Sequence, residues 1–192
     1  MNPKRFLNQI NSRKLWVVIF RGMPRAGKTT LAKILHHKLE DKYKIALIHY
    51  DNIFEMKIGG EQESLKPKIA IGMIEDFLVD GFNLILDYSF IFTTYLTQTT
   101  QLIEKYASGY LIYFLKPSFL EIVKRDKNFP SPKGIEALKD FWGIMENDNF
   151  PGCLEIDTGR LSIDESIEFI SKDMRSNMLI YANKRRSKCF SI

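Results

Sequence analysis

The chain has 192 residues, a net charge of +5 and 45% hydrophobic residues, which is the size and composition of one globular domain. Its two cysteines, Cys153 and Cys189, have no metal-binding or redox spacing. No apolar run approaches the roughly 18 residues that a membrane span needs. These features exclude a disulfide scaffold, a cysteine-ligated metal site and a membrane protein. We expect one cytoplasmic domain over residues 1–192, whose positive charge suits polyanionic ligands such as nucleotides.

Residues 22–29 read Gly-Met-Pro-Arg-Ala-Gly-Lys-Thr and match the phosphate-binding pattern G-x-x-x-x-G-K-[ST]. The apolar run at 15–20 predicts a buried strand before the motif, and apolar residues at helical spacing predict a helix from Thr29 onwards. In that context Lys28 is expected to reach the β- and γ-phosphates of ATP, and Thr29 to ligate Mg²⁺. The predicted nucleotide contacts in this loop are Gly22, Pro24, Arg25, Ala26, Gly27, Lys28, Thr29 and Thr30.

Two aspartates follow apolar segments that read as strands. Asp51 comes after residues 45–50, and Asp87 comes after residues 83–86. Ligands of open α/β sheets collect outside the carboxyl ends of the strands. Asp51 therefore either faces the γ-phosphate or caps the segment that follows it. Asp87 is a candidate for ordering Mg²⁺, generally through water.

The remaining segments alternate between helical and strand patterns. We predict helices over 68–79, 93–106 and about 117–127, and strands over 109–115 and 154–157. Ser162 to Glu165 has the pattern of a capping box, which would begin a long helix. That helix places Ile163, Ile167, Ile170 and Met174 on one face, and a basic tail covers 183–192. Together these segments predict an α/β fold with a five-stranded, mainly parallel sheet flanked by helices.

Residues 128–134 read Asn-Phe-Pro-Ser-Pro-Lys-Gly, and their prolines and glycine exclude regular structure. A basic segment of this kind between two helices is interpreted as a short mobile lid, at about 126–140, over the phosphates. The alternative is a plain surface loop.

Several motifs resemble those of the adenylylsulfate kinase-like P-loop kinases, which are related in fold to the nucleoside monophosphate kinases. The phosphate loop with its Thr-Leu-Ala continuation, and Asp51-Asn52, are similar to that family's motifs. So are Arg125-Asp126 with Lys127-Asn128, Phe-Trp-Gly-Ile at 141–144, and the segment 154–158. The resemblance runs from about residue 15 to residue 170.

The resemblance implies roles for individual residues. Asp51 would accept the proton of the substrate hydroxyl, Arg125 would cover the adenine of ATP, and the turn at Thr158-Gly159 would border the same base. The candidate catalytic residues are thus Asp51, Lys28 and Arg125, with Thr29 and Asp87 as the candidate metal ligands. ATP and Mg²⁺ are the expected cofactors.

The sequence departs from the family in the half that would hold the acceptor. His49-Tyr50 replaces an Asp-Gly pair, Phe54 stands where the family has an arginine, and no arginine occurs between Gln62 and Phe77. We expect a kinase that transfers the γ-phosphoryl group to a hydroxyl of a small acceptor other than adenylylsulfate. Two alternatives stay open. One is a polynucleotide 5′-hydroxyl kinase, favoured by the basic tail and a sequence pI of about 9.1, and the other is a non-catalytic nucleotide-binding module.

Overall fold

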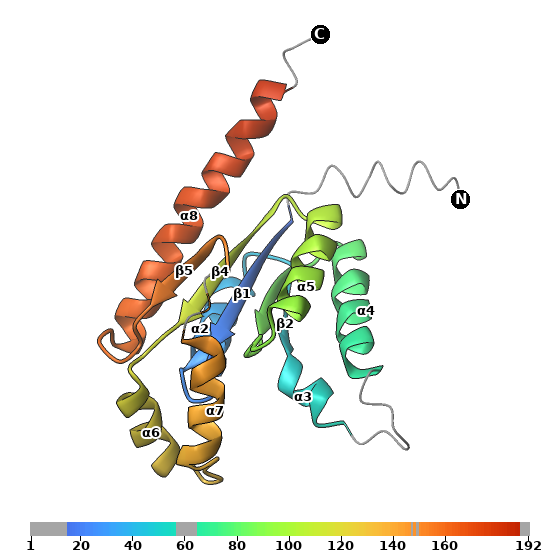
Figure 1. Cartoon of the computed structure of the whole chain (residues 1–192). Helices are drawn as coiled ribbons and strands as arrows, with labels where there is room; N and C mark the ends of the chain where they lie inside the picture. The colour runs from blue at the N-terminus through green and yellow to red at the C-terminus, as the bar shows by residue number, and fades with distance from the viewer. Residues whose placement is uncertain (1–14, 57–64, 147, 149, 189–192) are drawn as a thin grey trace.

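The structure is a computed structural model that describes residues 15–56, 65–146, 148 and 150–188, with side chains as far as Asn177. Five strands form one sheet in the order β2-β3-β1-β4-β5, and every neighbouring pair is parallel (Figure 1). The strands are β1 Trp16–Gly22, β2 Ile45–His49, β3 Asn83–Asp87, β4 Gly109–Leu115 and β5 Cys153–Ile156. The predicted α/β fold with a five-stranded sheet is confirmed, and the sheet is parallel throughout.

Seven helices flank this sheet in the part of the chain that the structure describes. They are α2 Lys28–Leu39, α3 Tyr50–Phe54, α4 Leu65–Val79, α5 Thr93–Tyr106, α6 Phe119–Lys127, α7 Ile135–Met145 and α8 Ile163–Lys188. The C-terminal part of α8 extends beyond the end of the sheet (Figure 1). Among the described residues, no helix is long and apolar enough to cross a membrane. The last residues of the predicted basic tail, 189–192, and the polar stretch at 57–64 lie outside the described residues.

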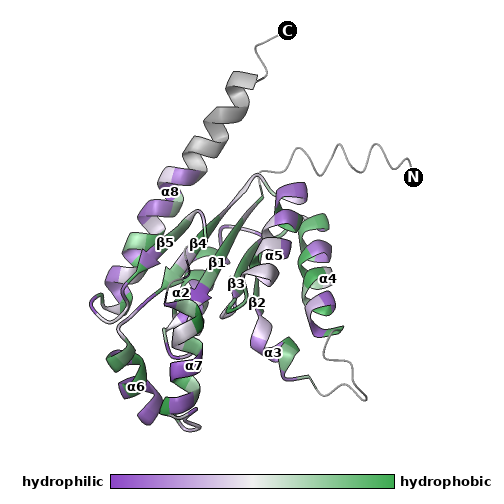
Figure 2. Cartoon of the chain, in the orientation of Figure 1, coloured by the Kyte–Doolittle hydropathy of each residue, from purple (hydrophilic) through white to green (hydrophobic). Residues whose placement is uncertain are grey.

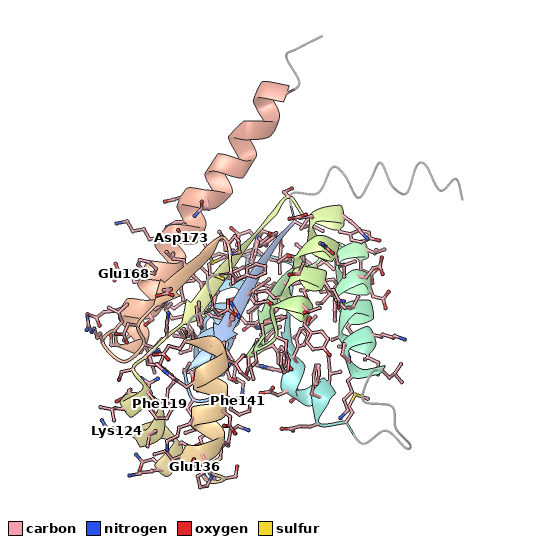
Figure 3. The ribbon with its side chains drawn as sticks, viewed as in Figure 1. Phe119, Lys124, Glu136, Phe141, Glu168 and Asp173 are labelled. Carbon is pink, nitrogen blue, oxygen red and sulfur yellow. The ribbon has the colours of Figure 1, made fainter. Side chains whose placement is uncertain are left out.

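The inner strands β1, β3 and β4 are mainly apolar on both faces, as expected for a sheet that helices cover on both sides (Figure 2). Val18 and Phe20 of β1 pack with apolar residues of α2, α6, α7 and α8. Phe119 on α6 and Phe141 on α7 lie against this same core (Figure 3). Val17 and Ile19 pack on the other side with α3, α4 and α5. The alternation along β1 therefore supports two separate apolar layers.

The central strand β1 lies between β3 and β4. The next two strands in the chain, β2 and β3, therefore lie on one side of β1, and the last two, β4 and β5, lie on the other. In open parallel sheets, such a reversal of strand order opens a crevice at the carboxyl ends of the strands. The phosphate loop, which joins β1 to α2, begins at this point. The fold therefore places residues 22–29 at the sheet edge where ligands of such folds bind.

Two predictions about the end of β2 need correction. β2 ends at His49, one residue early, because Tyr50 begins the short helix α3 and buries its ring in the core. Asp51 therefore lies in the first turn of α3, whose N-cap is His49, so Asp51 is not the cap residue.

Ile163 was predicted to share one face of α8 with Ile167, Ile170 and Met174, but it is 50% exposed while the other three are buried. The capping box explains this position. The Ser162 amide donates to Glu165 Oε2 at 2.8 Å, and the Glu165 amide donates to Ser162 Oγ at 3.2 Å. Ile163 is thus the first residue of the helix, one turn before Ile167 reaches the core.

Arg21 is fully buried at the end of β1, just past the apolar run at 15–20 that predicted the strand. Its guanidinium forms an ion pair with Asp148, and its Nε and Nη2 donate to the carbonyl of Phe90 at 3.2 and 3.0 Å. It also lies over the rings of Phe114 and Phe150. Arg21 therefore ties the strand before the phosphate loop to the β3–α5 loop and to the segment after α7.

This buried ion pair predicts a large stability effect. Asp148→Asn keeps the side-chain size but leaves the buried Arg21 guanidinium without its carboxylate. The free energy of unfolding, measured by urea denaturation, should fall by about 3–5 kcal/mol. Asp140→Asn, at an exposed position of α7, is the matched control and should change it by less than about 0.5 kcal/mol.

The pH dependence of this effect has a definite sign. Hydrogen bonds from Arg21 lower the pKa of Asp148 below its ordinary value. The stabilisation is therefore complete above the unfolded-state pKa of about 4, and is lost as the pH falls through the lower folded-state pKa. Wild type and Asp148→Asn should converge in acid, and equal stability at neutral pH would contradict the assignment.

Candidate functional site

The phosphate loop begins with a close approach of two backbones. Gly22 has φ +142°, and a Cβ at this position would lie 2.4 Å from the carbonyl oxygen of Leu115 on β4. The Gly22 amide donates to the carbonyl of Ser89 at 3.3 Å. The other motif glycine, Gly27, has φ +98°, which L side chains rarely adopt. Both glycines of the motif are therefore required by backbone geometry.

Helix α2 begins directly after this loop with its N-terminus open. Its N-cap is Gly27, no side chain caps the helix, and no acidic residue occurs in its first turn. Thr29 and Thr30 are exposed at this end. The first-turn amides and the partial positive charge of the helix end therefore suit a bound anion such as a phosphate.

Lys28 contacts the phosphate loop and interacts electrostatically with two carboxylates, those of Asp87 and Asp51. Its ammonium is buried and donates to the carbonyl of Met23 at 3.0 Å. Burial lowers the pKa of Lys28, while the charges of Asp87 and Asp51 act in the opposite direction. The structure thus brings together three of the predicted site residues at the carboxyl edge of the sheet.

Asp51 is exposed to solvent on the first turn of α3. Partial loss of hydration raises its pKa above the ordinary value, and the Asp87 charge adds to this effect while the Lys28 charge opposes it. A carboxylate with a raised pKa beside a phosphate loop is a stronger base than an ordinary aspartate.

Asp87 is buried at the end of β3, and its Oδ2 contacts His49 Nδ1 at 2.7 Å. The two residues are register partners across the β2–β3 pair. No sequence motif predicts this pair, because it follows from strand register. Because Oδ2 contacts His49, Oδ1 is the oxygen through which Asp87 could order a metal-bound water.

The residues present fit a Mg²⁺ ion held mainly by phosphates and water. No group of three or more His, Cys, Asp or Glu side chains that could hold a metal occurs among the described residues. Thr29 and Asp87 offer hard oxygen ligands of the kind that Mg²⁺ uses together with substrate phosphates. The protein would therefore supply few ligands itself.

Arg125 on α6 links the phosphate loop to the segment after β5 by hydrogen bonds. Its Nη2 donates to the carbonyl of Thr158 at 2.6 Å, and its Nη1 donates to the carbonyl of Arg25 at 3.3 Å. The Thr158 hydroxyl donates to the carbonyl of Ala26 at 2.7 Å. Glu121, one turn earlier on α6, accepts from Arg125 Nε at 2.9 Å and orients the guanidinium. Sequence analysis missed Glu121, although its i, i+4 spacing to Arg125 is a usable signal.

Arg25 directs its side chain toward residues 128–134 and adopts φ +67°, which is rare for an arginine. Its Nε donates to Asp126 Oδ1 at 2.8 Å, and its Nη2 donates to the carbonyl of Ser131 at 2.8 Å. The guanidinium carbon lies 3.4 Å from the centre of the Phe129 ring. Arg25 therefore connects the phosphate loop to the segment that was predicted to be a lid.

Asp126 organises that segment from within. It is buried, and it accepts hydrogen bonds from the amides of Lys133 at 3.1 Å and Gly134 at 3.0 Å. The hydrogen bond from Arg25 is the main reason why the pKa of Asp126 is lowered. One carboxylate thus folds the loop between α6 and α7 around the phosphate-loop arginine.

These contacts predict the hydrogen exchange of residues 128–134. Arg25→Ala removes a charged hydrogen-bond partner of Asp126, so exchange in this segment should accelerate by at least about tenfold. Lys127→Ala removes an exposed cation nearby and should leave the exchange rate of this segment unchanged.

In the wild type, an ATP analogue with Mg²⁺ should slow hydrogen exchange in residues 128–134 if the segment closes as a lid. Unchanged exchange on nucleotide addition would make it a plain surface loop.

No protein-family model matches the chain, and no curated protein matches it either. Solved structures do match. A tunicamycin resistance protein from Deinococcus radiodurans has a TM-score of 0.61 at 14% identity, over 83% of this chain and 95% of that one. The APS kinase CysC of Mycobacterium tuberculosis has a TM-score of 0.61 at 15% identity, over 83% and 97%.

A gluconokinase from Sinorhizobium meliloti is similar over 93% of this chain and 98% of its own, with a TM-score of 0.57 at 13% identity. The chain has a P-loop kinase fold. At these identities the P-loop kinase fold is what the likeness shows. The predicted resemblance is therefore confirmed at the level of the fold, while the specific likeness to adenylylsulfate kinases is not.

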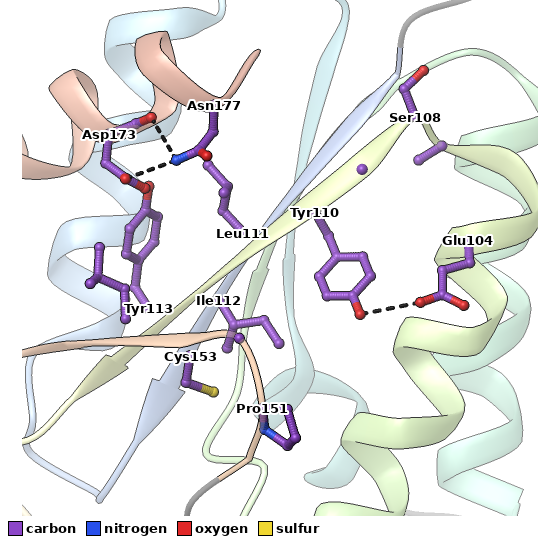
Figure 4. A pocket seen from close by; sticks show the side chains of 14 residues that line it. Glu104, Ser108, Tyr110, Leu111, Ile112, Tyr113, Pro151, Cys153, Asp173 and Asn177 are labelled. Carbon is purple, nitrogen blue, oxygen red and sulfur yellow. Dashed lines mark hydrogen bonds between the residues drawn. The ribbon is translucent and has the colours of Figure 1, made fainter. Parts of the chain in front are cut away.

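A groove of about 630 Å³ lies between α5 and α8, beside the N-terminal half of β4 (Figure 4). Tyr110 donates to Glu104 at its α5 side, and Tyr113 donates to Asp173 at its α8 side. The strands are parallel, so the groove lies away from the carboxyl edge that carries the phosphate loop. It is not part of the candidate site.

Proposed function

We propose that the protein is an ATP- and Mg²⁺-dependent kinase that transfers the γ-phosphoryl group to a hydroxyl of a small acceptor. The observation that carries this proposal is the position of the exposed Asp51 carboxylate in the first turn of α3, directly after the end of β2, whose last residue pairs with Asp87. An anion near the phosphates would repel ATP unless it handled an acceptor or a metal. The P-loop kinase fold supports the same conclusion, because solved structures of that fold include kinases of different small molecules.

The proposed reaction assigns a task to each residue. The loop amides and Lys28 hold the β- and γ-phosphates, and Arg125 with Thr158 borders the base of ATP. The acceptor oxygen attacks the γ-phosphorus while Asp51 takes its proton, and the bond between the γ-phosphorus and the bridging oxygen breaks to release ADP. Such a transfer requires mainly positioning and charge neutralisation from the protein.

The metal is assigned to Thr29 and Asp87. Mg²⁺, when bound, neutralises phosphate charge as it builds up on the leaving ADP. Thr29 would ligate it directly through the exposed hydroxyl at the start of α2, and Asp87 would act through water. His49 fixes the rotation of the Asp87 carboxylate through the 2.7 Å contact, and thereby which oxygen faces that water.

The donor half of the proposal predicts the effect of Lys28→Ala. Loss of the ammonium should lower kcat by about 10²–10³, because its charge stabilises the transferring phosphoryl group. Lys33→Ala, an exposed cation on the same helix, should retain wild-type turnover at saturating ATP. A wild-type rate for Lys28→Ala would refute the assignment of the loop.

The acceptor half predicts the effect of Asp51→Asn, which keeps the shape and removes the base. kcat should fall by about 10²–10⁴, the usual contribution of a positioned general base. ATP affinity, measured by calorimetry, should stay the same or rise because a like charge has been removed. The double variant Asp51→Asn with Asn52→Asp places a carboxylate one residue further along the chain. This variant should not regain turnover. Partial rescue by excess Mg²⁺ would instead make Asp51 a metal ligand.

The same assays distinguish the alternatives. Preferred phosphorylation of 5′-hydroxyl oligonucleotides would make the protein a polynucleotide kinase. Tight ATP binding without turnover of either kind of acceptor would make it a nucleotide-binding module.

A further inference from the structure

Four aromatic rings gather beside Asp51, and the proposed catalytic steps use none of them. Tyr50 and Phe54 come from α3, and Tyr88 and Phe90 follow β3. We call these four residues the aromatic wall. The Tyr88 ring is stacked on Tyr50 at 4.9 Å and 21°, and on Phe54 at 5.0 Å and 18°. Phe90 packs against Tyr50 and Tyr88 at 5.3 and 5.1 Å.

Two of the four rings form the back of the wall. Tyr50 is buried, and its hydroxyl lies 3.5 Å from Thr99 Oγ1 on α5. Phe90 is fully buried and has φ +46°, a conformation that an aromatic residue rarely adopts. The two hydrogen bonds from Arg21 to the Phe90 carbonyl hold this unusual backbone in place. Strain of this kind persists where the surroundings fix it, often at functional sites.

The other two rings, those of Phe54 and Tyr88, are partly exposed and form the front of the wall. Phe54 follows Asp51 by three residues on the same short helix, so the two side chains lie on adjoining parts of its surface. The Tyr88 ring is stacked on the ring of Phe54, so it lies beside the same part of α3. The front of the wall therefore borders the proposed base.

The same region of the chain contains no guanidinium group. No arginine occurs between Arg25 and Arg125, a span that includes all of α3, α4, β3 and α5. The buried Lys66 ammonium donates to the Phe54 carbonyl at 2.7 Å and so supports the wall itself. A phosphate or sulfate group on the acceptor is best compensated by bidentate guanidinium partners. Beside Asp51, the aromatic wall instead presents the partly exposed rings of Phe54 and Tyr88.

From these contacts we infer that the acceptor is an uncharged alcohol that carries a flat aromatic ring, as a nucleoside or an aryl alcohol does. The ring lies against Phe54 and Tyr88, and the hydroxyl points to Asp51. The step is the transfer already described, in which the hydroxyl proton passes to Asp51 as the new O–P bond forms. The inference rests on the proposed kinase function and adds the class of acceptor.

The test uses the full chain, ATP with Mg²⁺, and matched acceptors. Adenosine is compared with ribose, which lacks the ring, and with adenosine monophosphate and a 5′-hydroxyl oligonucleotide, which add anionic groups. Benzyl alcohol represents an aryl alcohol. The better of the two neutral ring alcohols should have the highest kcat/KM. We expect this value to exceed that for ribose and for both anionic acceptors by at least about tenfold, which corresponds to the energy of one aromatic stacking contact.

Variants of the front rings test the surface directly. Phe54→Leu and Tyr88→Leu should each raise KM for the ring alcohol about tenfold while leaving ATP affinity unchanged. Tyr88→Phe keeps the ring and should behave as wild type, and so should Phe92→Leu, which alters an aromatic side chain that is 61% exposed outside the wall. Thermal unfolding of each variant separates loss of fold from loss of contact.

The outcomes distinguish the inference from the function on which it rests. If ribose or an anionic acceptor is phosphorylated as well as the ring alcohols, the kinase assignment stands and the acceptor class is wrong. If calorimetry shows that the ring alcohols bind in the presence of an ATP analogue but no acceptor turns over, the wall binds its ligand and the kinase function fails. If none of them binds and none turns over, both are refuted.

Discussion

The site depends on how closely β1 approaches its two neighbours where it ends. Gly22 lies so near the carbonyl of Leu115 that no Cβ fits between them, and its amide donates to the carbonyl of Ser89. This position joins the phosphate loop to the end of β4 on one side and to the β3–α5 loop on the other. Because the loop is held at that point, α2 starts with its open end beside Asp87, and the Asp51 carboxylate on α3 lies within electrostatic reach of Lys28.

The two halves of the candidate site differ in chemistry. On the donor side, Arg25 and Arg125 contact the loop and its surroundings through charged hydrogen bonds. On the proposed acceptor side, stacked aromatic rings lie beside the exposed Asp51 carboxylate. A guanidinium group confers directional contacts with anions, whereas an aromatic face accepts many flat molecules with little directional preference. The contacts of Arg25 and Arg125 thus stabilise the loop itself, whereas the rings of Phe54 and Tyr88 stay partly exposed.

Much of the fold could be predicted from the sequence because its signals are local. The strand before the phosphate loop, the glycine positions and the capping box at Ser162 each depend on residues within a few positions of one another. The start of α3 at Tyr50 could not be predicted, since it depends on how that ring packs in the core. Nor could the role of Arg21, whose partner Asp148 is far along the chain and carries no pattern that links it to β1. Within the site, the motif identified Lys28, while the pairing of His49 with Asp87 follows only from strand register.

The contacts of Arg125 and Thr158 have a consequence for the direction of the peptide groups in the loop. Both residues bind carbonyl oxygens, those of Arg25 and Ala26, and no peptide bond among the described residues is cis. In a planar trans peptide the N–H points opposite to the C=O. Drawing the Ala26 carbonyl toward Thr158 therefore turns the Gly27 amide to the other side of the loop. The two side chains thus orient N–H groups that they do not contact, because each of these groups belongs to the same peptide unit as the carbonyl that is bound.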